Sequence, residues 1–119
     1  MLAYVERPEQ AEVVHRYLEL TGDKRSVRAL GSASLEITWA GLGRAEAFVD
    51  VRGRLRVVDV AAAAWIAREA GAVVAVERPE ASLTRVERIG SIAVASPGAW
   101  ERLRRALEES GHRWTGNLL

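Results

Sequence analysis

The sequence of 119 residues predicts a single α/β domain in which a sheet of about five strands lies between two layers of helices. Three observations support this prediction. Short apolar segments and longer helical segments alternate along the chain. Glycine or proline punctuates most of the boundaries between them. Some short segments, such as "AVVAVE" at 72–77, are apolar without interruption, which is typical of strands covered on both faces. We therefore expect a three-layer αβα sandwich with a mixed, mostly parallel sheet.

The chain begins with an extended segment and an amphipathic helix. "LAYVE" at 2–6 is predicted to be a strand, and Pro8 suits the first turn of the helix that follows. The apolar stripe of this helix consists of Val13, Val14, Tyr17 and Leu18. "SVRAL" at 26–30 is a further strand candidate.

A second helix is predicted between the corner Gly31–Ser32 and Gly43, a residue that suits the position just after a helix. We expect its apolar face to be buried; this face consists of Leu35, Trp39 and Leu42. "AEAFVDV" at 45–51 alternates as a strand does, and "RGRLR" at 52–56 follows as a charged turn or extension.

The second half continues the alternation. The segment from 57 to 70 is apolar nearly all round, which predicts an internal helix. Strands are predicted at 72–77 and 91–96. Ser96 as N-cap and Pro97 in the first turn mark the start of a last helix, whose expected buried face is Trp100, Leu103 and Leu107.

Composition excludes several classes of protein. The chain is 49% hydrophobic and 28% charged, as in globular rather than disordered chains. No apolar run reaches the roughly 18 residues of a membrane span, and no signal-peptide pattern is present. The absence of cysteine excludes disulfides and thiolate metal sites. A net charge of +1 and the lack of a stacking motif argue against nucleic-acid binding. We expect a cytoplasmic protein with no membrane partner.

Asp59 stands near the start of the apolar helix, and it has two interpretations. A carboxylate in the first turn accepts backbone N–H bonds and complements the positive end of the helix dipole. Alternatively, the helix holds the carboxylate rigidly as a metal ligand. The residue alone does not decide between them.

Three further features have both a structural and a functional interpretation. The small-residue corner "LGSAS" at 30–34 is either a tight turn or a helix N-terminus that binds an anion or a sugar hydroxyl. Asp50 is either a solvent-facing strand residue or a ligand-binding acid. The arginines of "RGRLR" belong to a solvated turn or clamp phosphates; they are Arg52, Arg54 and Arg56.

The order of these features carries a family resemblance. "R-x-x-G-S-A" begins at Arg28, and "G-R-A-E-A-F-V-D" at 43–50, "V-D-V-A-A-A" at 58–63 and "E-A-G" at 69–71 follow it. This series resembles the C-terminal half of the inositol monophosphatase family, the lithium-sensitive, magnesium-dependent sugar phosphatases. Its archaeal members act on both inositol monophosphate and fructose 1,6-bisphosphate. The resemblance covers nearly the whole chain.

The resemblance implies roles for individual residues. Asp59 matches the family Asp that binds a catalytic Mg²⁺ ion, which makes it the implied catalytic and metal-binding residue. Asp50 matches an acid, more often Glu, that binds a substrate hydroxyl. The corner of Gly31, Ser32 and Ala33 matches the residues that contact the sugar ring. Val58 replaces the family Trp before the metal-binding Asp, which changes packing rather than chemistry.

One family motif is absent. The family assembles its metal site mainly in an N-terminal domain that carries D-P-x-D-G-S/T, and this chain contains neither D-P nor D-G. The resemblance therefore implies that residues 1–119 are the substrate-side half of a phosphatase, nearly inactive without the N-terminal half or a partner subunit. We expect such a half to self-associate as a homo-oligomer, for example a dimer. The alternative is a non-catalytic binding or assembly module that keeps the fold.

Overall fold

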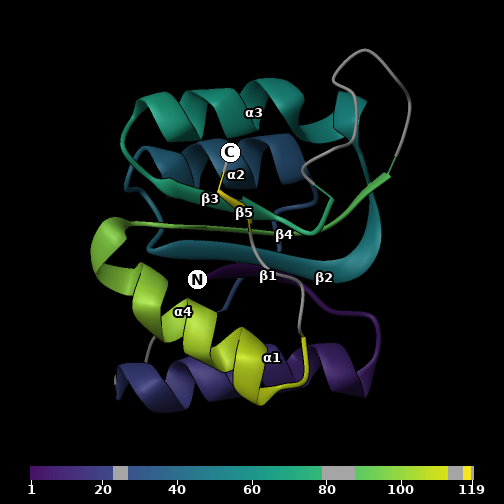
Figure 1. The fold of residues 1–119 in the computed structure, drawn as a ribbon, viewed down its shortest axis with the longest axis vertical. Coiled ribbons are helices and arrows are strands. Elements are labelled where there is room, and N and C mark those ends of the chain that lie inside the picture. The colour runs from purple at the N-terminus through teal and green to yellow at the C-terminus, as the bar shows by residue number, and fades with distance from the viewer. Residues whose placement is uncertain (23–26, 79–87, 113–116, 119) are drawn as a thin grey trace.

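Helices and strands alternate in the computed structural model, which describes residues 1–22, 27–78, 88–112 and 117–118 (Figure 1). The strands are β1 (Leu2–Tyr4), β2 (Ala47–Arg56), β3 (Val73–Val76), β4 (Arg88–Ala95) and β5 (Asn117–Leu118). The helices are α1 (Pro8–Thr21), α2 (Ala33–Gly41), α3 (Val57–Glu69) and α4 (Pro97–Glu109). None of the described helices is both long and apolar enough to cross a membrane.

The sheet has the strand order β1-β2-β4-β3-β5 and is mixed, as predicted. The expectation of mostly parallel pairing is wrong: β1 and β2 pair in parallel, whereas the pairs β2–β4, β3–β4 and β3–β5 are antiparallel. Strands β2 and β3 are both antiparallel to β4, which lies between them. They therefore run in the same direction, and α3 connects them. Helices cover both faces, so the antiparallel strands show the uninterrupted apolar runs that are typical of parallel ones.

Two cores form on the two faces of the sheet, which confirms the three-layer architecture (Figure 1). Helices α2 and α3 cover one face, where Phe48, Val74 and Ile92 are buried. Helices α1 and α4 cover the other face, where Val49 and Ala93 are buried. The predicted stripe of α1 is confirmed, since Val13, Val14 and Tyr17 are buried and Leu18 is half-buried.

One predicted strand is absent from the described part of the chain. Residues 27–30 form no strand, and Arg28 makes a single parallel bridge with Leu2. Residue 26 of that prediction lies outside the described residues. Of the two alternatives for "RGRLR", a turn or an extension of the strand, the extension is confirmed, because β2 continues to Arg56. The extension holds a register shift and the positive φ of 75° at Gly53, and β2 bends strongly there (Figure 1).

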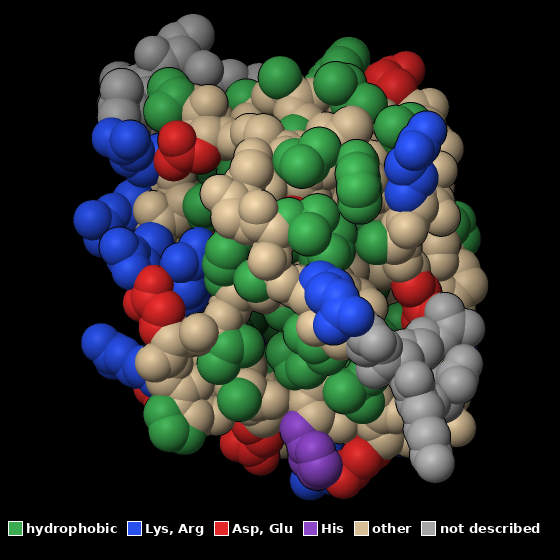
Figure 2. All heavy atoms as spheres, turned by 180° about the vertical axis from the view of Figure 1, so that it is seen from behind, with side chains coloured by type: hydrophobic (Ala, Val, Ile, Leu, Met, Phe, Trp, Pro, Cys, Tyr) green, Lys and Arg blue, Asp and Glu red, His purple; other side chains and the backbone are tan. Residues whose placement is uncertain are grey.

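The predicted buried face of α2 is wrong. Leu35, Trp39 and Leu42 are exposed, and the residues that face the sheet and α3 are Glu36, Ile37, Ala40 and Gly41. Helix α3 is likewise not internal, because Val58, Trp65 and Ile66 are exposed. We name these six exposed side chains, five on α2 and α3 and one at Leu42, the C-cap of α2, the apolar helix face. Figure 2 shows hydrophobic side chains at the surface of this helical layer, in its upper part.

Candidate functional site

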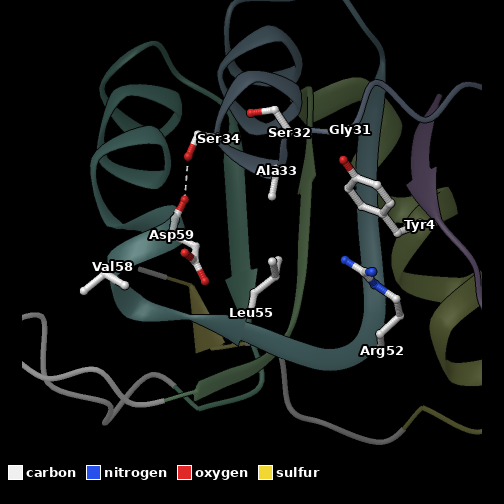
Figure 3. Close-up of a pocket in the computed structure, with 9 residues that line it drawn as sticks. All are labelled: Tyr4, Gly31, Ser32, Ala33, Ser34, Arg52, Leu55, Val58 and Asp59. Atoms are coloured by element: carbon white, nitrogen blue, oxygen red, sulfur yellow. Dashed lines mark hydrogen bonds between the residues drawn. The ribbon is translucent and has the colours of Figure 1, made fainter.

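A pocket of about 490 Å³ opens where α2 and α3 begin, beside the bend of β2 (Figure 3). Both helices present their N-termini to it, so their first-turn N–H groups and positive dipole ends face the same space. The lining residues are Tyr4, Gly31, Ser32, Ala33, Ser34, Arg52, Leu55, Val58 and Asp59.

Asp59 lies in the first turn of α3, with its carboxylate directed toward the pocket (Figure 3). The Oδ2 atom accepts a hydrogen bond of 3.1 Å from the backbone N–H of Arg56, and it lies 3.6 Å from the Arg56 Nε. The capping interpretation is therefore confirmed. Both contacts involve Oδ2 alone, and the side chain is 40% exposed. Capping thus leaves the carboxylate accessible to a ligand in the pocket.

The small-residue corner forms the opposite wall of the pocket. Ser32 is the N-cap of α2, and its Oγ accepts a hydrogen bond of 3.3 Å from the backbone N–H of Leu35. Ser34 Oγ donates a hydrogen bond of 2.5 Å to the backbone carbonyl of Asp59, which ties the start of α2 to the start of α3 (Figure 3). Gly31 has a φ of 84°, a left-handed conformation that favours glycine.

The buried carboxyl group of Glu36 stabilises the small-residue corner. Glu36 is fully buried, and it accepts a hydrogen bond from the backbone N–H of Leu30. Its Oε2 atom has no hydrogen-bond partner among the described residues. Burial raises the pKa of Glu36, with a further contribution from the negative charge of Asp50. Burial and the nearby Glu36 also raise the pKa of Tyr4.

Asp50 lies outside the pocket lining. It is 1% exposed, so the interpretation as a solvent-facing strand residue is wrong. Arg52 binds its carboxylate, with Nε 3.0 Å from Oδ1 and Nη2 2.7 Å from Oδ2. The backbone N–H of Arg52 donates a third bond, of 3.0 Å, to Oδ1. The charged side chain of β2 that lines the pocket is therefore Arg52 and not Asp50.

The pocket thus brings together Asp59 and the predicted corner of Gly31, Ser32 and Ala33, but not Asp50. No local signal in the sequence points to Tyr4, because a tyrosine at the end of a short strand has no distinctive pattern. Arg52 is one of three arginines of "RGRLR", and the sequence does not distinguish between them. The distinction between these arginines came from the extension of β2, which turns Arg52 inward and leaves Arg54 and Arg56 exposed.

The described residues can supply part of the ligand set of a magnesium ion but not a complete set. Among them, no group of three His, Asp or Glu side chains lies close enough to hold a metal ion. Asp59 supplies the carboxylate of the pocket lining. Mg²⁺ requires octahedral oxygen ligands and usually takes one or two carboxylates, with water or phosphate oxygens completing the shell. Asp59 can therefore provide one ligand, and further ligands would have to come from elsewhere.

Known proteins share both the sequence and the fold. The family model of the inositol monophosphatase family matches residues 2–112. An inositol-1-monophosphatase of Aeropyrum pernix is 39% identical over 106 residues, which cover 84% of this chain and 40% of that protein. A fructose-1,6-bisphosphatase/inositol-1-monophosphatase of Methanothermobacter thermautotrophicus is 48% identical over 54 residues, 45% of this chain and 19% of that protein.

The structural comparison agrees. The solved structure of Mycobacterium tuberculosis SuhB superposes with a TM-score of 0.66 and 31% sequence identity, and the match covers 93% of this chain and 40% of that one. The chain thus spans at most about 40% of the length of these relatives. Because the family model matches nearly all of the sequence, the chain belongs to the inositol monophosphatase family.

Proposed function

We propose that this chain is the substrate-side part of a Mg²⁺-dependent phosphatase that hydrolyses inositol monophosphate or a sugar phosphate. The observation that carries the proposal is the pocket, where a carboxylate in the first turn of α3 faces the small-residue corner of α2. Relatives named as inositol-1-monophosphatase and fructose-1,6-bisphosphatase support this class of substrate.

Each part of the pocket has a distinct task in this proposal. Asp59 offers one carboxylate oxygen to a divalent cation, and a bound cation would neutralise phosphate charge. The backbone of Gly31, Ser32 and Ala33 places N–H groups and a positive dipole end beside the sugar. Ser34 holds the start of α2 against the start of α3, because its Oγ donates a hydrogen bond to the Asp59 carbonyl. These groups orient a phosphorylated polyol.

Completion of the site requires polypeptide beyond these residues. The described residues hold no cluster of metal-binding side chains, and the chain spans about 40% of its relatives. The apolar helix face adds an independent argument, because its six large apolar side chains are exposed, and one of them, Val58, lines the pocket. Contiguous exposed apolar surface is typical of an interaction site. We infer that the metal-binding part of the enzyme packs there.

Complementation tests this proposal. Phosphate release from inositol 1-phosphate and fructose 1,6-bisphosphate is measured with excess Mg²⁺ for the chain alone and for the chain mixed with the part of the Aeropyrum pernix relative that this chain does not match. We expect negligible turnover by the chain alone and metal-dependent turnover by the mixture. Asp59→Asn should abolish most of that turnover, whereas Glu69→Gln, an exposed acid at the other end of α3, should not.

Two outcomes would contradict the proposal. Robust turnover by the isolated chain would show that the site is complete without a second part. Full activity of the Asp59→Asn variant in the mixture would leave Asp59 with its capping role alone. A mixture that associates without any turnover would favour the alternative of a binding or assembly module.

A further inference from the structure

The connection that leads into α2 has little backbone support of its own. Residues 29–31 form no helix or strand, and none of them makes a backbone–backbone hydrogen bond within the described part of the chain. Backbone bonding stops at Arg28 and resumes at the carbonyl of Ser32. Gly31, the last residue of this connection, lines the pocket (Figure 3). Side chains therefore decide how firmly one wall of the pocket is held.

Glu36 supplies this support from inside the fold. It lies in the first turn of α2 and is fully buried, and its Oε1 accepts a hydrogen bond from the backbone N–H of Leu30. Burial raises the pKa of Glu36, and the backbone N–H groups of Leu30 and Gly31 oppose this rise because they stabilise the charged form. The carboxyl group thus interacts with the two residues that lead into the small-residue corner.

The chemistry of this position favours a specific role for the carboxyl group. Burial of a carboxylate costs free energy, most of all when no cation compensates it. Within the described part of the chain, the groups that shift the pKa of Glu36 include no Lys, Arg or His side chain. An apolar side chain would fill this part of the core without that cost. What Glu36 adds to packing is an acceptor for the Leu30 N–H.

We propose that Glu36 is a positioning residue of the pocket, whose carboxyl oxygen fixes the backbone at Leu30 and thereby the orientation of the corner of Gly31, Ser32 and Ala33 toward the ligand. The proposal rests on the proposed function for its class of ligand, a phosphorylated polyol. Glu36 acts through the corner, since it does not line the pocket itself. Without the acceptor, the corner would adopt several orientations, and ordering it on binding would lower the affinity.

Three substitutions separate the acceptor from the charge and the length of the side chain. Glu36→Gln keeps an acceptor and removes the charge, whereas Glu36→Leu keeps similar volume without an acceptor. Glu36→Asp keeps the charge on a side chain that is too short to reach the Leu30 N–H.

NMR on the ¹⁵N-labelled 119-residue chain follows the amide signals of residues 30–33, first without ligand and then during titration with inositol 1-phosphate. We expect the Gln variant to keep the signals and the affinity of the wild type. The Leu and Asp variants should shift and broaden these signals before ligand is added, and they should bind about tenfold more weakly.

A control variant separates this role from a general loss of core packing. Val74→Ala removes methyl groups from a strand residue that is 2% exposed in the same core. It should lower the free energy of unfolding but leave the amide signals of residues 30–33 and the affinity as in the wild type. Urea denaturation shows which variants are folded under the NMR conditions, and the Asp variant carries the test if the Leu variant is unfolded.

The outcomes distinguish this proposal from the proposed function. Unmoved amide signals in the Leu and Asp variants, or wild-type affinity in both, overturn the positioning role. Equal losses in the Gln and Leu variants, or the same loss in Val74→Ala, overturn it as well. If the wild type does not bind inositol 1-phosphate while the signals move in the Leu and Asp variants alone, the positioning role stands and the proposed function fails.

Discussion

Gly41 of α2 packs directly against Ala67 of α3, so closely that a Cβ atom on Gly41 would lie 2.5 Å from both the Cα and the Cβ of Ala67. The backbone conformation of Gly41 is ordinary for a helix, and the contact alone requires glycine. This approach sets the spacing of the two helices whose N-termini form the pocket.

The first prediction follows from this contact. Gly41→Ala should lower the free energy of unfolding by about 1–3 kcal/mol, because backbone atoms of α3 must move to admit the methyl group. Gly98→Ala is the matched control, since a Cβ there meets nothing within 4 Å. It should leave stability unchanged or raise it by up to about 1 kcal/mol. Urea denaturation measures both, and equal stabilities would contradict the close contact.

The second prediction separates the two roles of Asp59. Asp59→Asn should change the free energy of unfolding of the isolated chain by less than about 1 kcal/mol, because an amide oxygen can still accept the Arg56 N–H. The same variant should lose most of the activity in the complemented enzyme. The stability of the isolated Asp59→Asn chain is therefore measured by denaturation, and its activity after complementation is measured by phosphate release. A large loss of stability would instead mean that inactivity reflects unfolding.

The third prediction concerns the apolar helix face. We expect the isolated chain to self-associate through it, and Trp65→Gln should weaken that association because Trp65 is 59% exposed on this face. Val5→Gln, which changes an exposed apolar residue between β1 and α1, should leave it unaltered. Light scattering over a range of concentrations gives the mass. A wild-type chain that stays monomeric at high concentration would contradict the prediction.

The fourth prediction is a pH dependence caused by Glu36. Its pKa is raised in the folded protein, so its contribution to stability is fully present below the unfolded pKa and is lost as pH rises through the folded pKa. Tyr4 and Asp50 are the titratable groups that influence it. Glu36→Gln keeps an acceptor for the Leu30 N–H and cannot ionise.

The variant should therefore be more stable than the wild type at pH 8, and this advantage should shrink as pH falls toward the range in which an ordinary carboxyl group titrates. Urea denaturation of both proteins across this pH range measures the difference. A difference in stability that does not change with pH would show that Glu36 keeps an ordinary pKa.

Local signals in the sequence determined where several elements start and stop. Ser32 is the N-cap of α2, Pro97 lies in the first turn of α4, and Asp59 lies in the first turn of α3. Each follows from chemistry within four residues, since a cap or a proline acts on the adjacent turn. The order of the motifs also identified the family, because they follow one another along the chain in the same order as in the family, whose model matches residues 2–112.

Tertiary structure alone decided strand direction, the exposed helix face and the state of Asp50. Uninterrupted apolar strands indicate cover on both faces, and they carry no information on whether neighbours run parallel or antiparallel. An apolar helix such as α3 does not reveal which side meets its own sheet, so the exposure of Trp65 depended on packing. Strand alternation places Asp50 and Arg52 on the same face of β2, but whether that face is covered depends on the rest of the fold, and Asp50 is 1% exposed.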